Sequence, residues 1–582
     1  NTLGQGAMVK VFSEGKIQIQ EQNLYRGFQS SVSPVLVFGL GESSRVDSVQ
    51  VNWPGGKVSM IKEVAANQTL VISQSEAGKK APSKSGKTET LLISAGKIAS
   101  PKANEVNDFK RQPLLSFEIS GNGKAMLVED FNGDGNPDVF LGGGAGMSGR
   151  LFFGQSNGQF GKPDSTAFVA ASQAEDSDAV SFDANGDGFT DLLVASGGMH
   201  QFNMGDAELQ DRLYLNDGKG KFSLSPNSLP KDSFPTGSVL VIDFNGDGFS
   251  DLFVGGRVIP GQYPTSPGAR IWIGDGKGNF TDQTAALAPD FKNLGMVTDS
   301  GLADLNGDGQ SELILVGDAM PVTVFSKSSN SWQNVTSEYF ETQQVGFWSD
   351  LLIGDWDKDG KPELFIGNHG KNSQLFASDT QPMELLYKDF DSNGSTDAIL
   401  SYYIQGEKYP SPSRDEVLGQ VLFLKKRYLD FKSFSEVKMD NLFTPEERKD
   451  TRSIFVNRLE TSYFVLGQNG KFQTKPLPIE AQFSPVFAAA STDLNGDGNP
   501  DLVFGGNLFD TKLKFGRYDA NHGAVLLGDG KGGFSTLPSV QSGVSIKGEM
   551  RKIEVLGEYL LFYTKDEGIH VLKRHLSKDS SQ

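Results

Sequence analysis

Cysteine is absent from this chain of 582 residues. Its absence excludes disulfides, thiolate catalysis and cysteine-based zinc sites. The sequence contains no run of 18 apolar residues, so we expect no membrane-spanning helix. Histidine is scarce, and the five histidines form no His-x-x-x-His pair of the kind that binds zinc. Phosphate-binding loops and basic, aromatic patches are also missing, which argues against nucleotide and nucleic-acid sites.

Positive charge is outweighed by negative charge. The chain holds 54 lysines and arginines against 72 aspartates and glutamates, which gives a formal net charge of -18. A pI near 4.9 argues against nucleic acid and anionic membrane surfaces as partners. Glycine is abundant at 69 residues without a collagen period, and this is typical of a chain with many tight turns.

One acidic motif organises the sequence. In the nine residues that begin at Asp130, side chains bearing oxygen occupy positions 1, 3, 5 and 9. Glycine occupies position 6, where a tight loop needs a positive φ, and position 7 can offer its backbone carbonyl. Ca²⁺ prefers about six to eight oxygen ligands at about 2.3–2.6 Å, and this spacing wraps such ligands around one point.

The motif occurs seven times, which predicts about seven bound Ca²⁺ ions; the alternative is a set of turns without metal. The expected ligands at positions 1, 3, 5, 7 and 9 are Asp130, Asn132, Asp134, Asn136 and Asp138; Asp183, Asn185, Asp187, Phe189 and Asp191; Asp243, Asn245, Asp247, Phe249 and Asp251; Asp304, Asn306, Asp308, Gln310 and Glu312; Asp355, Asp357, Asp359, Lys361 and Glu363; Asp389, Asp391, Asn393, Ser395 and Asp397; and Asp493, Asn495, Asp497, Asn499 and Asp501. The loops hold 22 carboxylates, and seven Ca²⁺ ions would leave the chain at about -4, so metal accounts for much of the acidity.

The loops differ from EF-hands. An EF-hand needs an acidic ligand at position 12 and flanking helices, whereas position 12 of the first loop is Leu141 and the closing acid stands at position 9. The flanks are short apolar runs that end in small residues, and these runs predict strands buried on both faces.

The chain divides into four parts. Residues 1–75 predict a small β unit with a hairpin at 9–20, and residues 76–104 predict a linker of small and charged residues. Residues 105–575 contain the repeats, and 576–582 form a tail. The repeats run as strand, acidic loop, strand, strand, hairpin and strand, and the first four loops begin 53, 60 and 61 residues apart.

This spacing predicts an all-β fold, a β-propeller of seven or eight four-stranded blades with calcium-binding loops. Seven motifs indicate seven blades. The apolar segment that begins at Arg551 looks like one more blade without metal, and we expect the strand at 114–119 to pair with it and close the ring. The count therefore favours eight blades.

Residues 1–75 carry a Phe-Gly-Leu-Gly turn at 38–41 and a strand that ends in Trp-Pro-Gly-Gly at 53–56. This stretch resembles the UnbV/ASPIC domain. That family has a further strand at its start, so we expect an incomplete domain here and an export signal upstream of Asn1. We expect Trp53 to pack in the core of the domain rather than to serve as a ligand platform.

The repeats resemble the FG-GAP/VCBS calcium repeats of integrin α propellers, and the whole arrangement is similar to bacterial homologues of cartilage acidic protein. The resemblance implies metal ligands at the matching loop positions and an exported or surface protein. Asn393 replaces the usual aspartate at position 5 of the sixth loop, so we expect weaker binding there.

An insertion at about 410–455 interrupts the repeats. Ser413 and Glu416 have the spacing of a capping box, and apolar residues follow at helical intervals. Thr444 and Pro445 predict the start of a second short helix. Two roles remain open for these helices, a binding surface or a cap over exposed blade ends.

We expect a non-enzymatic calcium-binding interaction protein, extracellular or on a bacterial surface, with a protein partner such as an outer-membrane complex. Calcium loops of modest affinity fill where Ca²⁺ is millimolar, which points outside the cytoplasm. The alternative is a glycan-binding or polysaccharide-degrading lyase on the same fold. A lyase would use His200 or His369 together with Arg257 or Tyr263.

Overall fold

The computed structural model describes residues 3–78, 90–99, 104–156, 158–231, 233–328 and 331–575. The chain forms two compact units, residues 1–88 and 89–582, and both consist mainly of antiparallel strands. This confirms a mostly β fold. Residues 79–89 and 100–103 of the expected linker, and the expected tail, lie outside the described residues.

The first unit is one sheet in the order β2-β1-β3-β4, with β1 at Met8–Ser13, β2 at Lys16–Glu21, β3 at Arg45–Asn52 and β4 at Val58–Ala65. The predicted hairpin is confirmed, because β1 pairs with β2 from Ser13 and Lys16 outward. Trp53 is buried in the core of this unit, and its indole N–H donates to the Ser59 hydroxyl at 2.9 Å. The expected packing role of Trp53 is therefore confirmed.

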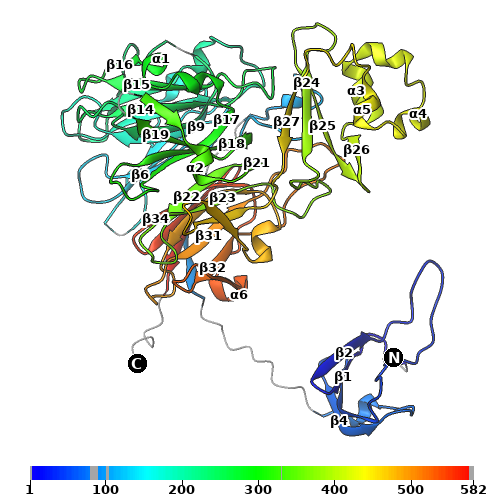
Figure 1. Ribbon diagram of the computed structural model, residues 1–582. Coiled ribbons are helices and arrows are strands. Elements are labelled where there is room, and N and C mark those ends of the chain that lie inside the picture. Colours follow the sequence, from blue (N-terminus) through cyan, green and yellow to red (C-terminus); the bar gives the residue numbers. More distant parts are fainter. Residues whose placement is uncertain are drawn as a thin grey trace. The chain divides into compact units, whose positions relative to one another are not determined.

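The second unit consists of separate antiparallel sheets (Figure 1). Its strands are β5 (Leu92–Ala99), β6 (Met126–Glu129), β7 (Asp138–Leu141), β8 (Arg150–Phe152), β9 (Glu175–Phe182), β10 (Asp191–Gly197), β11 (Arg212–Asn216), β12 (Phe222–Leu224), β13 (Thr236–Ile242), β14 (Asp251–Gly256), β15 (Ala269–Gly274), β16 (Phe280–Asp282), β17 (Met296–Ala303), β18 (Glu312–Pro321), β19 (Thr323–Ser328), β20 (Ser331–Asn334), β21 (Val345–Phe347), β22 (Asp350–Gly354), β23 (Glu363–Gly367), β24 (Met383–Lys388), β25 (Asp397–Ile404), β26 (Glu407–Pro410), β27 (Arg452–Val456), β28 (Ser462–Leu466), β29 (Phe472–Lys475), β30 (Val486–Thr492), β31 (Asp501–Gly506), β32 (Ala524–Gly528), β33 (Phe534–Leu537), β34 (Met550–Leu556), β35 (Tyr559–Thr564) and β36 (Gly568–Arg574). Its α-helices are α1 (Thr284–Leu287), α2 (Thr336–Tyr339), α3 (Arg414–Gln420), α4 (Phe431–Ser435), α5 (Met439–Leu442) and α6 (Ser539–Ser542).

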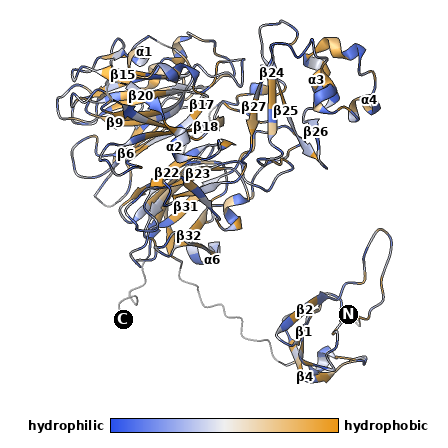
Figure 2. Ribbon diagram, viewed as in Figure 1, coloured by the Kyte–Doolittle hydropathy of each residue, from blue (hydrophilic) through white to orange (hydrophobic). Residues whose placement is uncertain are grey.

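Seven of these sheets follow one another side by side. Their first strands are in contact in the order β6, β9, β13, β17, β22, β30 and β34, and β34 in turn contacts β6. Carboxylates form hydrogen bonds between some neighbouring sheets. Asp178 of β9 accepts the Val239 N–H at 3.0 Å, and Asp299 of β17 accepts the Leu351 N–H at 2.9 Å. Hydrophobic residues mark the strands in Figure 2, and buried clusters join successive sheets.

The remaining sheet, in the order β26-β25-β24-β27, interrupts another sheet. It lies in the chain between β23 and β28, which pair directly with each other. β24 and β25, the first two of its strands along the chain, flank the sixth acidic loop. The expectation that seven motifs mark seven successive blades is therefore wrong, because pairing of β23 with β28 leaves the sixth motif on an inserted sheet.

The helical insertion follows β26. The capping box is confirmed, with Ser413 and Glu416 exchanging both hydrogen bonds at the start of α3. The second helix expected from Thr444 is absent from the described residues, and α4 and α5 precede that point instead. Thr444 and Glu447 do exchange hydrogen bonds, but residues 445–450 form turns, and β27 begins soon after them at Arg452.

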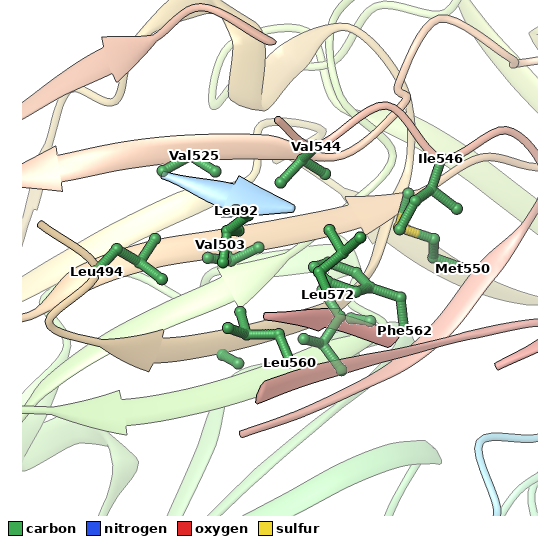
Figure 3. Close-up of a cluster of buried hydrophobic side chains, with 13 residues drawn as sticks. Leu92, Leu494, Val503, Val525, Val544, Ile546, Met550, Leu560, Phe562 and Leu572 are labelled. Carbon is green, nitrogen blue, oxygen red and sulfur yellow. The ribbon is translucent and has the colours of Figure 1, made fainter. Parts of the chain in front are cut away.

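The last sheet takes its outer strand from the start of the second unit. β5 pairs with β36 in the order β34-β35-β36-β5. Two expectations are thereby corrected: residues 92–99 are a strand rather than linker, and residues 114–119 are not the closing strand. The burial of Leu92 explains why β5 is the outer strand of this sheet, because Leu92 packs among Val544, Met550 and Leu572 in a core that Figure 3 shows.

Residues 105–123, which we call the crossing segment, tie several sheets together. The Asp108 carboxylate accepts the N–H groups of Ile119 and Ser120, which folds the segment on itself. The Gln112 amide donates to the carbonyl of Thr396, which lies in the sixth loop, and the Glu118 N–H donates to the carbonyl of Asp510.

We predict that Leu92→Ala lowers the free energy of unfolding by about 2–5 kcal/mol, because it empties part of the core that holds β5 in place. Ile93→Ala is the matched control, since Ile93 lies on the same strand and is 43% exposed. Urea denaturation of the full chain measures both changes. An equal effect of the two substitutions would show that β5 does not depend on the Leu92 contact.

Candidate metal sites

The seven acidic loops occupy one structural position. Each connects the first and second strands of its sheet, and position 9 begins the second strand. In every case position 9 pairs with the residue that precedes position 1, as Asp191 pairs with Phe182 and Glu363 with Gly354. The register is therefore identical in all seven loops, including the one on the inserted sheet.

The carboxylate at position 9 is buried in every loop, with 3% exposure or less. It accepts the N–H of position 2 in all seven loops, at 2.6–3.1 Å. Four of the seven sheets that touch in succession have aspartate at position 9. In these four sheets the other carboxylate oxygen accepts an N–H at the end of the third strand or just after it, as Asp191 does from Asn216 at 2.8 Å. Glu312 and Glu363 are longer and reach hydroxyls of the third strand instead, those of Ser326 and Tyr463.

The remaining side chains turn inward through backbone hydrogen bonds. The aspartate at position 1 accepts the N–H of the glycine at position 6 in all seven loops, at 2.8–3.1 Å. Position 5 accepts the N–H of position 7 at 2.7–2.9 Å, so Asn136, Phe189, Phe249, Gln310, Lys361, Ser395 and Asn499 are all held by the backbone. The structure thus brings the predicted residues of each loop together.

Two loops gather carboxylates most closely. Ligand oxygens of Asp355, Asp357, Asp359 and Glu363 all lie within 4.8 Å of one another, and so do those of Asp389, Asp391 and Asp397. These acidic clusters could hold a metal ion. Asp391 also has a buried oxygen, Oδ1, without a hydrogen-bond partner in the described residues. An oxygen-only donor set with an unpaired buried carboxylate oxygen fits a hard cation such as Ca²⁺.

Position 4 is a determinant that the sequence analysis missed. Like the glycine at position 6, it has a positive φ in all seven loops, and it is glycine in five of them. Lys358 and Ser392 occupy it in the fifth and sixth loops with φ of 60°, a conformation that costs an L-residue about 1 kcal/mol or more. The recurring glycine at position 4 was the available signal.

The loops also contact neighbouring sheets. The Asn216 side chain at the end of β11 donates to the carbonyl of Phe131 in the first loop at 2.8 Å. The Gly278 N–H, in the next sheet, donates to the carbonyl of Ala184 in the second loop at 2.9 Å. Lys358 of the fifth loop reaches the Gly498 carbonyl of the seventh loop at 2.7 Å. Order in a loop is therefore coupled to contacts between sheets.

Burial dominates the electrostatics of position 9. It raises the pKa of Asp138, Asp191, Asp251 and Asp397 to about 6 and that of Glu363 to about 7, against the opposing effect of the backbone N–H donors. Neighbouring loop carboxylates raise these pKa values further. A cation within the loop would favour the charged form and reverse the shift.

Three of the candidate catalytic residues lie together. Arg257, Tyr263 and His369 line a cavity of about 140 Å³ beside the crossing segment. Arg257 Nη2 pairs with Asp318 Oδ2 at 3.1 Å, and burial raises the pKa of Tyr263. Burial lowers the pKa of His369 to about 4, so this imidazole is neutral at physiological pH.

His200 lies apart from those three residues. Its Nδ1 is 3.8 Å from Oε2 of Glu175, which lines the cavity. Glu118 of the crossing segment lines the cavity as well. Sequence reasoning missed both glutamates, because they stand in no motif and only the crossing segment brings them together.

Two protein families match the sequence. Residues 1–79 match the ASPIC and UnbV family, and residues 130–194, 183–254 and 304–366 match the FG-GAP-like repeat. The chain therefore carries an ASPIC and UnbV domain followed by FG-GAP-like repeats. The matched repeats contain the first five acidic loops, while the sixth and seventh lie beyond them.

A search of curated proteins finds no match to the sequence. Among solved structures, the V. cholerae biofilm matrix protein Bap1 is 12% identical, with 84% of this chain and 91% of that chain covered at a TM-score of 0.33. The exotype rhamnogalacturonan lyase YesX is 11% identical (98% and 85% covered, TM-score 0.33), and the exo-inulinase from Aspergillus awamori is 10% identical (63% and 95% covered, TM-score 0.25). At these TM-scores the likeness supports no inference about function.

Among the described residues, no helix combines the length and the apolar character that crossing a bilayer requires.

Glu118 gives a pH-dependent prediction. Burial, with Asp108 and Asp510 nearby, raises its pKa to about 8 against the opposing effect of Lys565. Between about pH 4.5 and 8 the unfolded chain releases a proton that the folded chain keeps, so the wild type loses stability as the pH rises. Glu118→Gln removes this loss. We therefore expect the variant to melt a few degrees above the wild type at pH 9, with a smaller difference at pH 5.

Glu341→Gln is the control for this experiment, because Glu341 is exposed. Thermal denaturation at pH 5, 7 and 9 measures all three proteins. A difference between Glu118→Gln and the wild type that is the same at each pH would contradict the assignment.

Proposed function

We propose that the chain is a non-enzymatic, extracellular or cell-surface calcium-binding propeller that presents its loops to a protein partner. The observation that supports this most strongly is the repetition of one loop geometry at seven sites, with the same register and only oxygen donors. One such turn would be an ordinary Asx-rich connection. Seven copies with the same buried closing carboxylate favour one shared ligand.

The contacts between first strands support a ring of seven blades. Each sheet touches the next, and the last touches the first, so the strand edges are protected in the way that propellers protect them. In this arrangement β5 completes the last blade, and the inserted sheet with its helices is not one of the seven blades. Six blades would carry an acidic loop, and the seventh would carry none.

Calcium is the ion that the donor set favours. Carboxylate, amide and carbonyl oxygens suit hard cations, whereas Zn²⁺ and Cu²⁺ prefer the imidazole or thiolate that these loops lack. Mg²⁺ demands a stricter octahedron and usually keeps several waters. A loop with four or more protein oxygens is better matched to the larger, more adaptable shell of Ca²⁺.

Metal binding would stabilise the folded chain. An ion that binds only the folded loop lowers the free energy of the native state, by about 3–4 kcal/mol per site when its concentration is 100 to 1,000 times the dissociation constant. Without ions, 22 carboxylates remain crowded in seven turns. Loops of modest affinity would fill at millimolar Ca²⁺, which is the reason for placing the protein outside the cytoplasm.

We predict that excess EDTA lowers the melting temperature by 10 °C or more, roughly, and that Ca²⁺ restores it. Asp183→Asn should remove part of the Ca²⁺-dependent shift, because Asp183 holds position 1 of the second loop. Asp217→Asn is the matched control: its carboxylate also accepts two turn N–H groups, of Lys219 and Lys221, but it lies outside the acidic loops.

Calorimetry with and without Ca²⁺ measures these effects. The control should lower the melting temperature equally in both conditions. A melting curve of the wild type that is the same in EDTA and in Ca²⁺ would refute a structural role for the metal.

A protein partner is the remaining part of the proposal. Purification of the tagged chain from its native envelope, with Ca²⁺ and with EDTA, tests it. A stable stoichiometric partner that is recovered with Ca²⁺ and lost with EDTA would support the loops as the contact. Absence of any such partner under both conditions would refute this part.

A glycan-binding or lyase function is the second candidate, and the cavity lined by Arg257, Tyr263 and His369 is the observation that favours it. A glycan array and a lyase absorbance assay on mixed polysaccharides test this candidate. Turnover that His369→Ala abolishes without lowering the melting temperature would favour it over the non-enzymatic proposal.

A further inference from the structure

The helical insertion exposes an unusual group of side chains. Within residues 422–432, which we call the basic-apolar segment, Leu422 is 53% exposed, Phe423 37%, Leu429 75% and Phe431 66%. Elsewhere in the described part of the second unit, large exposed hydrophobic residues are more widely scattered along the chain. The segment follows α3 and includes the first two residues of α4, beside the inserted sheet (Figure 1). Exposed apolar groups this closely spaced mark a contact surface.

The exposure of this segment is imposed by its packing. Leu424 and Tyr428 are buried and anchor it, and the Tyr428 hydroxyl donates to the carbonyl of Leu442 at 3.0 Å. Arg414 of α3 donates to the carbonyls of Tyr428 at 3.1 Å and Leu429 at 3.0 Å. Its guanidinium also lies 5.1 Å from the centre of the Phe431 ring. The apolar side chains are therefore held outward on a fixed backbone.

Positive charge surrounds these apolar side chains. Lys425, Lys426 and Lys432 are exposed, and none of them forms an ion pair within the described residues. Asp430 is the single acidic residue of the segment, and its carboxylate caps α4 by accepting the Ser433 N–H. The segment is thus locally basic on a chain of net charge -18.

The net charge of the chain does not cancel this local charge. At physiological ionic strength, charges more than about 8 Å away are largely screened, so a surface that touches the segment experiences mainly the segment's own charges, which are net positive. The acidity of the chain as a whole disfavours anionic membranes, whereas the local charge at this site is positive.

The composition of the segment favours a lipid surface over a protein. Protein interfaces are enriched in aromatic residues, methionine and arginine but depleted in lysine, which the segment contains three times without an ion-pair partner. Leucine and phenylalanine next to free lysines are instead typical of segments that lie in the headgroup region of a bilayer. There the apolar side chains leave water and the lysines meet phosphate groups.

We propose that the basic-apolar segment docks the protein on an anionic lipid surface, with Leu429 and Phe431 entering the headgroup region and Lys425, Lys426 and Lys432 pairing with phosphates. This contact uses no residue of the acidic loops, so it is independent of the calcium proposal. It gives the helical insertion a role as a peripheral membrane contact.

The test is sedimentation of the full-length chain with vesicles of phosphatidylcholine alone or with phosphatidylglycerol at one third. We expect binding to the anionic vesicles that weakens with salt, and little binding to phosphatidylcholine. Each lipid is used both in Ca²⁺ and in EDTA, because Ca²⁺ can bridge acidic proteins to phosphates. Binding that vanishes in EDTA while the protein stays folded would overturn the proposal.

Two variants of the segment separate its components. The charge reversal Lys425→Glu with Lys426→Glu should weaken binding at least about tenfold, and Leu429→Ser with Phe431→Ser should do the same. The matched controls are Lys292→Glu and Val540→Ser, because Lys292 is exposed and Val540 is 70% exposed, both outside the insertion. Melting temperatures establish that each variant is folded.

The controls should bind like the wild type. Equal weakening by controls and segment variants would show a nonspecific effect and overturn the proposal, as would unchanged binding of both segment variants. Capture of an acidic protein that depends on the segment, with no vesicle binding, would assign the surface to a protein partner instead.

Discussion

The hydrogen bonds of one buried carboxylate underlie the architecture of the repeats. At position 9 of each loop it accepts the N–H of position 2 in all seven sheets. In four of the sheets that touch in a circle it also accepts an N–H near the end of the third strand. A single side chain thus connects the loop, the second strand and the third strand. A buried charge is costly unless it is paired in this way, so the loop, its register and its burial depend on one another.

This dependence explains why the same nonapeptide can serve both structure and metal binding. The backbone N–H groups orient the carboxylates inward, and a cation at the proposed site would offset the repulsion between the crowded oxygens. Because the loops contact the adjacent sheet through Asn216 and Lys358, order at one loop stabilises its neighbours. The chain has no disulfides with which to hold its sheets together, and these polar contacts supplement the hydrophobic clusters between them.

The two surfaces proposed for binding differ in physical character. The acidic loops form short, rigid turns in which nearly every polar group has a partner. The basic-apolar segment is also held in place, yet its three lysines form no ion pair among the described residues and four of its apolar side chains are exposed. Exposed apolar and charged groups on a fixed backbone are available to another surface, whereas the ion that we propose would complete the loops. The two proposals thus assign stability and surface contact to different parts of the protein.

The sequence alone determined the features that are formed by residues close together in the chain. The acidic loops, the strands that flank them, the hairpin of the first unit and the capping box at Ser413 all follow from short-range spacing, since turns and caps are made by residues a few positions apart. Only the tertiary structure decided the rest. The closing strand is β5 rather than residues 114–119, and the sixth loop stands on an inserted sheet. Both depend on which distant strands bury each other's side chains, as Leu92 and Leu572 do across most of the chain. Pairing of this kind is set by competition between alternative buried surfaces, which a repeat spacing does not encode.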